Sequence, residues 1–155
     1  MPTQLELENA VASSAKLAGT AAQPAVLPRK SAATTRILLV EDEPLTAQVF
    51  AMALRRDGMQ VDVCGNGLQA RQRVQEGKPT AVILDMSLPF RSGAEVLRDL
   101  RAAGHHDLPI LIVSGSDRRD ADVTSAELWP GAWIEKPIRP RDLVAVVREF
   151  LPDAR

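Results

Sequence analysis

Short apolar runs that end in polar residues recur along the chain from Arg36 onward. The clearest is AVILDMSLP, residues 81–89, where four apolar residues lead into Asp85 and a turn ending in proline follows. A continuous apolar run of this length between turn signals is typical of a strand buried on both faces. The runs RILLVEDEP, LPILIVSG and AWIEKP, together with the alternating segment QVDVCG, predict four more strands.

Between these strands, apolar residues recur at helical spacing. Gly58, Gly77 and Gly104 are expected to end three helices, and Asn66 is expected to cap one of them. The segment DRRDADVTSAEL, residues 117–128, is predicted to form a weaker, polar helix. Two helices have a well-defined apolar face. These faces are predicted to consist of Leu45, Val49, Met52 and Ala53 in the first helix and of Leu143, Val146, Val147 and Phe150 in the last.

Five strands and five helices therefore alternate along the chain. Alternation at this spacing implies right-handed βαβ units, in which helices cover both faces of a parallel sheet. The sequence thus predicts an α/β fold with a doubly wound, five-stranded parallel sheet. The domain is predicted to span residues 36–151, and residues 152–155 are predicted to be a C-terminal tail.

Residues 1–35 differ in composition from the rest of the chain. They are rich in Ala, Ser, Thr and Gln and contain no aromatic residue. Such a stretch has too little apolar surface to offset the entropy of ordering, so it is predicted to be a flexible N-terminal arm. The alternative, which the composition supports less, is that its few aliphatic side chains dock on a partner. These side chains are Leu5, Leu7, Val11 and Leu17.

The overall charge and the cysteine count exclude several classes of function. The chain has 19 basic and 20 acidic residues, and its formal net charge of -1 indicates no surface for nucleic acid or an anionic membrane. No apolar run approaches the roughly 20 residues of a membrane span, and the first residues lack the features of a signal peptide. Cys64 is the only cysteine, which excludes an internal disulfide and a zinc–cysteine cluster and favours a cytoplasmic location.

The ends of four predicted strands carry the candidate chemistry. In a doubly wound sheet the carboxyl ends of the strands lie at one edge, where ligands bind. Two carboxylates about 4 Å apart repel by roughly 4 kcal/mol, so a cluster of them favours a bound cation such as Mg²⁺. A lysine and a hydroxyl beside that cluster can stabilise a phosphoryl group. The residues concerned are Glu41, Asp42, Asp85, Ser114 and Lys136.

The motifs VEDEP, ILDMSLP, IVSGS and IEKP, in content and in spacing, resemble the receiver domain of bacterial two-component response regulators. The resemblance covers residues 36–151 and implies a flavodoxin-like sheet in the order 2-1-3-4-5. It also implies that Asp85 is the phosphoacceptor. Asp42 and Asp85 would bind Mg²⁺ directly, with the backbone carbonyl of Ser87 as the third protein ligand. Glu41 would act mostly through a bound water.

Three more positions match functional residues of that family. Ser114 matches the switch hydroxyl, Lys136 the lysine that contacts the phosphoryl group, and Trp133 the switch aromatic. The bond between Lys136 and the next residue matches a peptide bond that is cis in the family, a state that is accessible before proline. The chain departs from the family pattern in having Trp133 where Phe or Tyr is usual, and in the unusually polar helix before it.

The leading hypothesis is a single-domain response regulator that accepts a phosphoryl group on Asp85 from a histidine kinase or a histidine phosphotransfer protein. It would signal by contact with an unknown downstream protein, without direct binding to nucleic acid or membrane, and it is not expected to be an enzyme. One alternative is a degenerate receiver that only binds partners. A less supported alternative is a phosphatase with an aspartyl nucleophile, because such enzymes usually have an acid where Ser87 stands.

Overall fold

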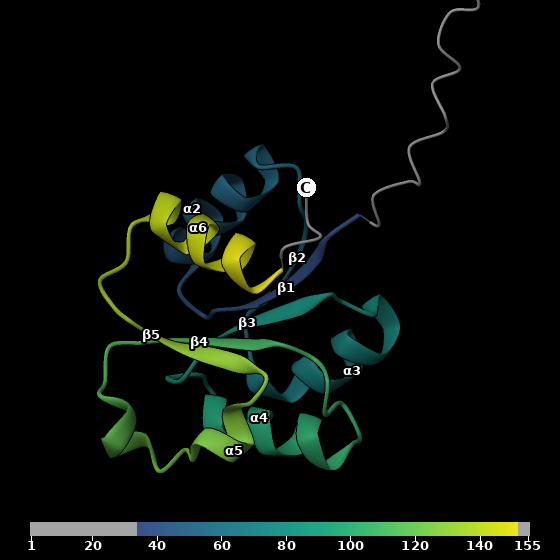
Figure 1. The fold of residues 1–155 in the computed structure, drawn as a ribbon, viewed down its shortest axis with the longest axis vertical. Helices are drawn as coiled ribbons and strands as arrows, with labels where there is room; N and C mark the ends of the chain where they lie inside the picture. Colours follow the sequence, from purple (N-terminus) through teal and green to yellow (C-terminus); the bar gives the residue numbers. More distant parts are fainter. Residues whose placement is uncertain (1–33, 152–155) are drawn as a thin grey trace, which may run out of the picture. The chain divides into compact units, whose positions relative to one another are not determined.

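The computed structural model of the protein describes residues 34–151, which form a five-stranded parallel sheet with helices on both faces (Figure 1). The strand order is β2-β1-β3-β4-β5, as predicted. The strands are β1 (Arg36–Val40), β2 (Gln60–Cys64), β3 (Ala81–Asp85), β4 (Ile110–Ser114) and β5 (Gly131–Glu135). The predicted tail, and the predicted arm apart from its last two residues, lie outside the described residues.

Helices α2 and α6 cover one face of the sheet, and α3, α4 and α5 lie over the other (Figure 1). Their bounds are α2 (Pro44–Arg56), α3 (Gly67–Gly77), α4 (Gly93–Ala102), α5 (Ser125–Leu128) and α6 (Pro140–Phe150). The side chain of Asn66 caps α3, as predicted, by accepting a hydrogen bond from the N–H of Gln69 at 3.1 Å. Within residues 34–151, no helix has the length and apolar character needed to cross a membrane.

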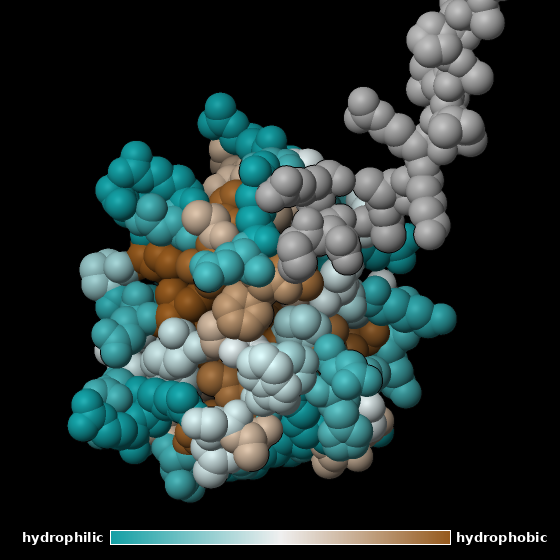
Figure 2. Space-filling model, in the orientation of Figure 1, coloured by the Kyte–Doolittle hydropathy of each residue, from teal (hydrophilic) through white to brown (hydrophobic). Residues whose placement is uncertain are grey.

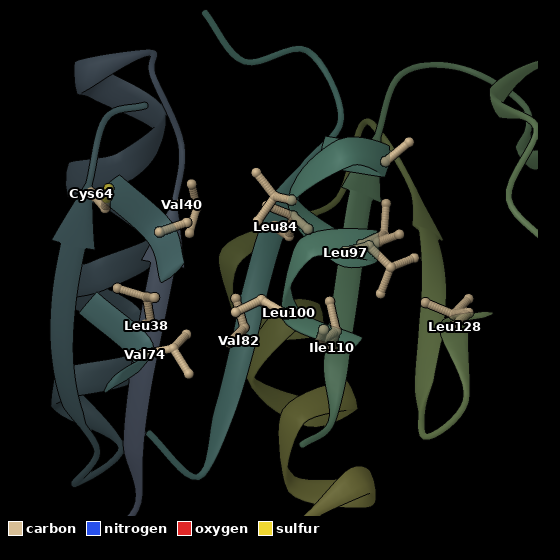
Figure 3. Close-up of a cluster of buried hydrophobic side chains, with 14 of the residues drawn as sticks. Leu38, Val40, Cys64, Val74, Val82, Leu84, Leu97, Leu100, Ile110 and Leu128 are labelled. Atoms are coloured by element: carbon tan, nitrogen blue, oxygen red, sulfur yellow. The ribbon is translucent and has the colours of Figure 1, made fainter. Parts of the chain in front are cut away.

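Two hydrophobic clusters fill the space between the sheet and its helices, because successive residues of a strand point to opposite faces. In β1, Ile37 and Leu39 belong to the cluster that includes α2 and α6, whereas Leu38 and Val40 belong to the cluster that includes α3 and α4. Figure 3 shows side chains of β1, β3 and β4 gathered with those of α3 and α4 in the latter cluster. Strands β3 and β4 are buried throughout, which explains their uninterrupted apolar sequence.

The prediction of which face of α2 is buried is wrong. The residues that α2 buries are Ala47, Phe50, Ala51 and Leu54. Leu45, Val49 and Met52 lie on the opposite side of the helix and are exposed. The helix carries two apolar stripes with residues three or four apart, so periodicity alone does not identify the stripe that faces the sheet. In α6, by contrast, Leu143 and Val147 are buried as predicted.

Residues 117–128 form two short elements instead of the single helix that was predicted. A 3-10 turn, η1 (Arg118–Ala121), is followed by Asp122, whose φ of 50° lies in the left-handed region, before α5 begins. The side chains of Asp117 and Thr124 cap these two elements. Short polar side chains compete for backbone N–H groups, so this sequence favours caps and turns over a continuous helix.

Two arginines of α4 hold this segment in place. The guanidinium of Arg101 donates hydrogen bonds to five backbone carbonyls between residues 105 and 130, at 2.6 to 3.2 Å. Arg98 donates to the carboxylate of Glu127 at 2.8 Å. That bond, together with those from Thr124, lowers the pKa of Glu127 to about 2. Polar contacts with α4 therefore fix the path of the chain between β4 and β5.

The loop after β3 contains a residue in an unfavourable backbone conformation. Phe90 has a φ of 67°, and the N–H of Arg91 donates to the carbonyl of Pro89 at 2.8 Å across it. A three-residue turn of this hand is rare and strained for a residue with a side chain. Phe90 is 81% exposed, so burial of its ring does not offset the strain.

Phe90→Gly is expected to stabilise the domain by about 0.5–1 kcal/mol, because glycine avoids a left-handed penalty of roughly 1–2 kcal/mol but loses more entropy on folding. Phe90→Ala is the control, since it removes the ring and keeps the penalty, and it should bring no gain. Unfolding of both variants in denaturant measures the difference. A glycine variant no more stable than the alanine variant would contradict the assignment of strain.

Candidate functional site

The carboxyl ends of the strands meet at one edge of the sheet, as the parallel topology requires. Asp85 ends β3 and Ser114 ends the neighbouring strand β4. Glu41 directly follows β1, and its N–H donates to the carbonyl of Cys64 at the end of β2. Lys136 directly follows β5, and its N–H donates to the carbonyl of Ser114 at 2.7 Å. The peptide bond after Lys136 is cis, as the resemblance implied.

Three carboxylates and one ammonium group lie close together at this edge. Carboxylate oxygens of Glu41, Asp42 and Asp85 lie within 4.8 Å of one another. Nζ of Lys136 lies 3.2 Å from Oε2 of Glu41 and 3.6 Å from Oδ2 of Asp85. The side chains of Glu41 and Asp85 are only 3% and 7% exposed, whereas Asp42 is exposed to solvent. The structure thus brings together the acids and the lysine that the sequence placed at strand ends.

The electrostatics of this cluster favour a divalent cation. Burial raises the pKa of Glu41 above its ordinary value and repulsion from Asp85 adds to the shift, while hydrogen bonds from the Glu43 N–H and from Lys136 oppose it. One ammonium group beside three carboxylates leaves excess negative charge, which a cation would relieve. The three acidic side chains offer only oxygen ligands, and carboxylates supplemented by water suit Mg²⁺.

Backbone groups define the surroundings of Asp85. The N–H of Ser87 donates to Oδ1 of Asp85 at 3.3 Å, while the role of the Ser87 carbonyl as a metal ligand stays a prediction. Gly93 begins α4, and a Cβ at this position would lie 2.4 Å from the carbonyl oxygen of Asp85. Only glycine therefore allows α4 to start so close to this loop. The sequence showed Gly93 as the start of a helix but gave no sign of this close approach.

Of the predicted switch pair, Ser114 is buried inside the domain and Trp133 is partly buried. Ser114 is 1% exposed, and its hydroxyl accepts a hydrogen bond from the N–H of Ser116 at 3.1 Å. Trp133 packs against the cluster that includes α3 and α4. Within residues 34–151, its buried indole N–H has no hydrogen-bond partner. A buried indole N–H usually finds one, and an unsatisfied donor costs about 1–3 kcal/mol.

Comparison with known proteins identifies the family. The family model of the response regulator receiver domain matches residues 37–148. The chain is 36% identical over 116 residues to the DNA-binding response regulator MtrA of Mycolicibacterium smegmatis, a match that covers 75% of this chain and 50% of MtrA. It is 35% identical over 120 residues to the transcriptional regulatory protein PcoR of Escherichia coli, which covers 77% of this chain and 53% of PcoR.

Solved structures agree with this result. The response regulator protein TrrA of Thermotoga maritima, in complex with Mg²⁺–BeF, matches with a TM-score of 0.67 at 26% identity, covering 76% of this chain and 99% of that one. The fold is that of a receiver domain. The chain belongs to the response regulator receiver domain family of two-component systems. It spans about half the length of the curated relatives it matches.

Mg²⁺ is expected to raise the Tm of the protein, because the ion relieves repulsion among the three carboxylates. A ligand at about 100 times its Kd stabilises the folded state by roughly 2.7 kcal/mol. Asp42→Ala should remove most of this response. Asp62→Ala, which removes an acid on β2 that pairs with Arg73, is the control and should keep it. Thermal melts in EDTA and in millimolar Mg²⁺ measure the shift. A wild-type Tm that is the same in both would contradict the assignment of a Mg²⁺ site.

Proposed function

We propose that the chain is a phosphoacceptor that takes a phosphoryl group on Asp85 from the phosphohistidine of a histidine kinase or a histidine phosphotransfer protein. The observation that carries the proposal is the ammonium group of Lys136, 3.6 Å from Oδ2 of Asp85. Phosphoryl transfer is promoted by positive charge placed in advance beside the reacting oxygens. A turn or capping aspartate at a strand end needs no such partner.

In the proposed transfer, a carboxylate oxygen of Asp85 attacks phosphorus in line with the leaving imidazole nitrogen. The new O–P bond forms as the P–N bond breaks, and the bonding electron pair returns to the imidazole. Lys136 stabilises the negative charge of the phosphoryl oxygens. Asp42 and Asp85, with the Ser87 carbonyl and a water held by Glu41, would bind Mg²⁺, which when bound neutralises further charge on these oxygens.

The proposed output is contact with a downstream protein in the cytoplasm. The chain has no excess of basic residues, with 19 against 20 acidic, so we expect the signal to reach neither DNA nor a membrane directly. MtrA is described as DNA-binding, and this chain matches half of it. We propose slow hydrolysis of the acyl phosphate as the step that ends the signal. An aspartyl phosphatase fits less well, because Ser87 stands where such enzymes carry their general acid–base.

Incubation with acetyl phosphate and Mg²⁺ is expected to add one phosphoryl group to the protein. Asp85→Asn should abolish the addition, because the amide is a poor nucleophile and carries no charge. Asp62→Asn is the matched control and should label like the wild type. Intact mass spectrometry measures each case. Labelling that persists in Asp85→Asn would place the acceptor elsewhere, and no labelling of the wild type would favour the degenerate receiver.

Lys136→Ala should slow labelling by acetyl phosphate roughly 10–100-fold, since a hydrogen bond to a charged group contributes about 1.5–3 kcal/mol. The variant should remain folded, because the side chain is 30% exposed and its partners are charged groups. Rapid-quench labelling gives the rate, and circular dichroism checks the fold. A rate equal to that of the wild type would contradict the proposed role. An unfolded variant would make Lys136 a structural residue.

We also propose that Trp133 reports phosphorylation. A phosphoryl group on Asp85 would attract the Ser114 hydroxyl, and the indole ring, whose buried N–H has no partner within residues 34–151, would change its packing in response. Beryllofluoride with Mg²⁺ is therefore expected to change the indole fluorescence in a Trp129→Phe background. The change should vanish in Ser114→Ala. Constant fluorescence despite an occupied Asp85 would exclude Trp133 from the response.

A further inference from the structure

The solvent-facing side of α2 carries an aliphatic stripe that the core does not use. Leu45, Val49 and Met52 follow one another at intervals of four and three residues and are 69%, 48% and 53% exposed. The buried face of the same helix lies on the opposite side. Figure 2 shows hydrophobic surface in the region that α2 and α6 occupy in Figure 1. Large aliphatic side chains gathered on one exposed helix face are typical of an interaction surface.

A groove continues this stripe toward the loop after β5. Its volume is about 580 Å³. Its lining consists of Leu45, Thr46, Val49, Phe50, Lys136, Pro137, Ile138 and Pro140. Most of these side chains are apolar, so the groove fits aliphatic side chains from a partner better than it fits a polar ligand.

The two ends of α2 carry opposite charges. Asp42 and Glu43 precede the helix and are exposed, and Arg55 and Arg56 are its last two residues and are also exposed. Arg56 lies one turn beyond Met52 and so on the same face. Among the ion pairs formed within residues 34–151, none involves either arginine. The outer face of α2 is thus acidic at one end, aliphatic in the middle and basic at the other end.

A face with this order of charges complements an antiparallel copy of itself. With a two-fold axis near Val49, Leu45 of one copy would face Met52 of the other. Arg56 of each copy would then lie near the acidic end of its neighbour. Intervals of four and three residues also suit helices that pack at a shallow angle of about 20°.

We propose that the outer face of α2 is an interface between two copies of this chain, packed antiparallel about Val49. The stripe from Leu45 to Met52 is only about 10 Å long at 1.5 Å per residue, so the association is weak and reversible, as small interfaces are.

Cysteine cross-linking in the full chain tests the arrangement. Val49→Cys is expected to form a disulfide-linked dimer in oxidised glutathione, and the native Cys64 does not interfere because it is 2% exposed. Met52→Cys alone is not expected to cross-link. Its two copies would lie about 10 Å apart along the helix axes, and a disulfide needs Cα atoms about 4.4–6.8 Å apart. A mixture of Leu45→Cys and Met52→Cys should instead give the mixed dimer. Leu68→Cys, 60% exposed on α3, controls for random collisions.

Sedimentation of the full chain provides an independent measure. The mass of the wild type is expected to rise from 16.8 kDa toward twice that value as concentration increases. Val49→Glu should abolish the rise, and Arg56→Glu should weaken dimerisation at least about tenfold, the effect of losing roughly 1.4 kcal/mol. Arg71→Glu on α3, with the same change of charge, should dimerise like the wild type. Circular dichroism checks that each variant is folded.

Two results would overturn the proposal. One is a wild-type chain that keeps the monomer mass up to millimolar concentration. The other is cross-linking of Leu68→Cys as fast as that of Val49→Cys. Either result would mean that the stripe on α2 binds a different protein and not a second copy of this chain. Neither depends on phosphorylation, so failure of this proposal is distinguishable from failure of the proposed function.

Discussion

Electrostatic repulsion among carboxylates at one edge of a parallel sheet is the constraint on which the site depends. Glu41 and Asp85 are almost fully buried and lie beside Asp42. Burial and mutual repulsion therefore make the ionised form of these carboxylates unfavourable. Lys136 offsets part of that cost from the other side. The cluster persists because β1, β3 and β4 are held in register by two apolar clusters of the core. The same uncompensated negative charge makes the site suited to a metal ion.

Helix α4 connects this site with the segment that leads to β5. Its first residue, Gly93, lies against the backbone of Asp85, so the start of the helix follows the position of that loop. Farther along, Arg98 and Arg101 hold the chain between β4 and β5 by hydrogen bonds. One helix therefore contacts both the loop of Asp85 and the chain that enters β5, where Trp133 lies. These contacts use side chains of this particular sequence on a fold common to the family.

Much of the site follows from the sequence through one rule of topology. Apolar runs ending in Asp85 and Ser114 indicate strands, and alternation with helices indicates a parallel sheet whose strand ends share an edge. Glu41 and Lys136, 95 residues apart, could therefore be placed at the same edge of the sheet before any coordinates were known. Tertiary packing sets the short distance between them, the burial of their surroundings and the raised pKa of Glu41. These features cannot be predicted from the sequence pattern alone.

Local signals in the sequence determined the strands, the helix caps and most helix ends, because these depend on residues within a few positions of one another. Tertiary structure decided which stripe of α2 is buried, because Val49 and Phe50 lie on stripes of similar periodicity and only the fit against the sheet separates them. It also decided where the end of the segment 117–128 lies, because Arg101 of another helix donates hydrogen bonds to the carbonyls of Glu127 and Leu128. In both cases the deciding contact comes from a distant part of the chain.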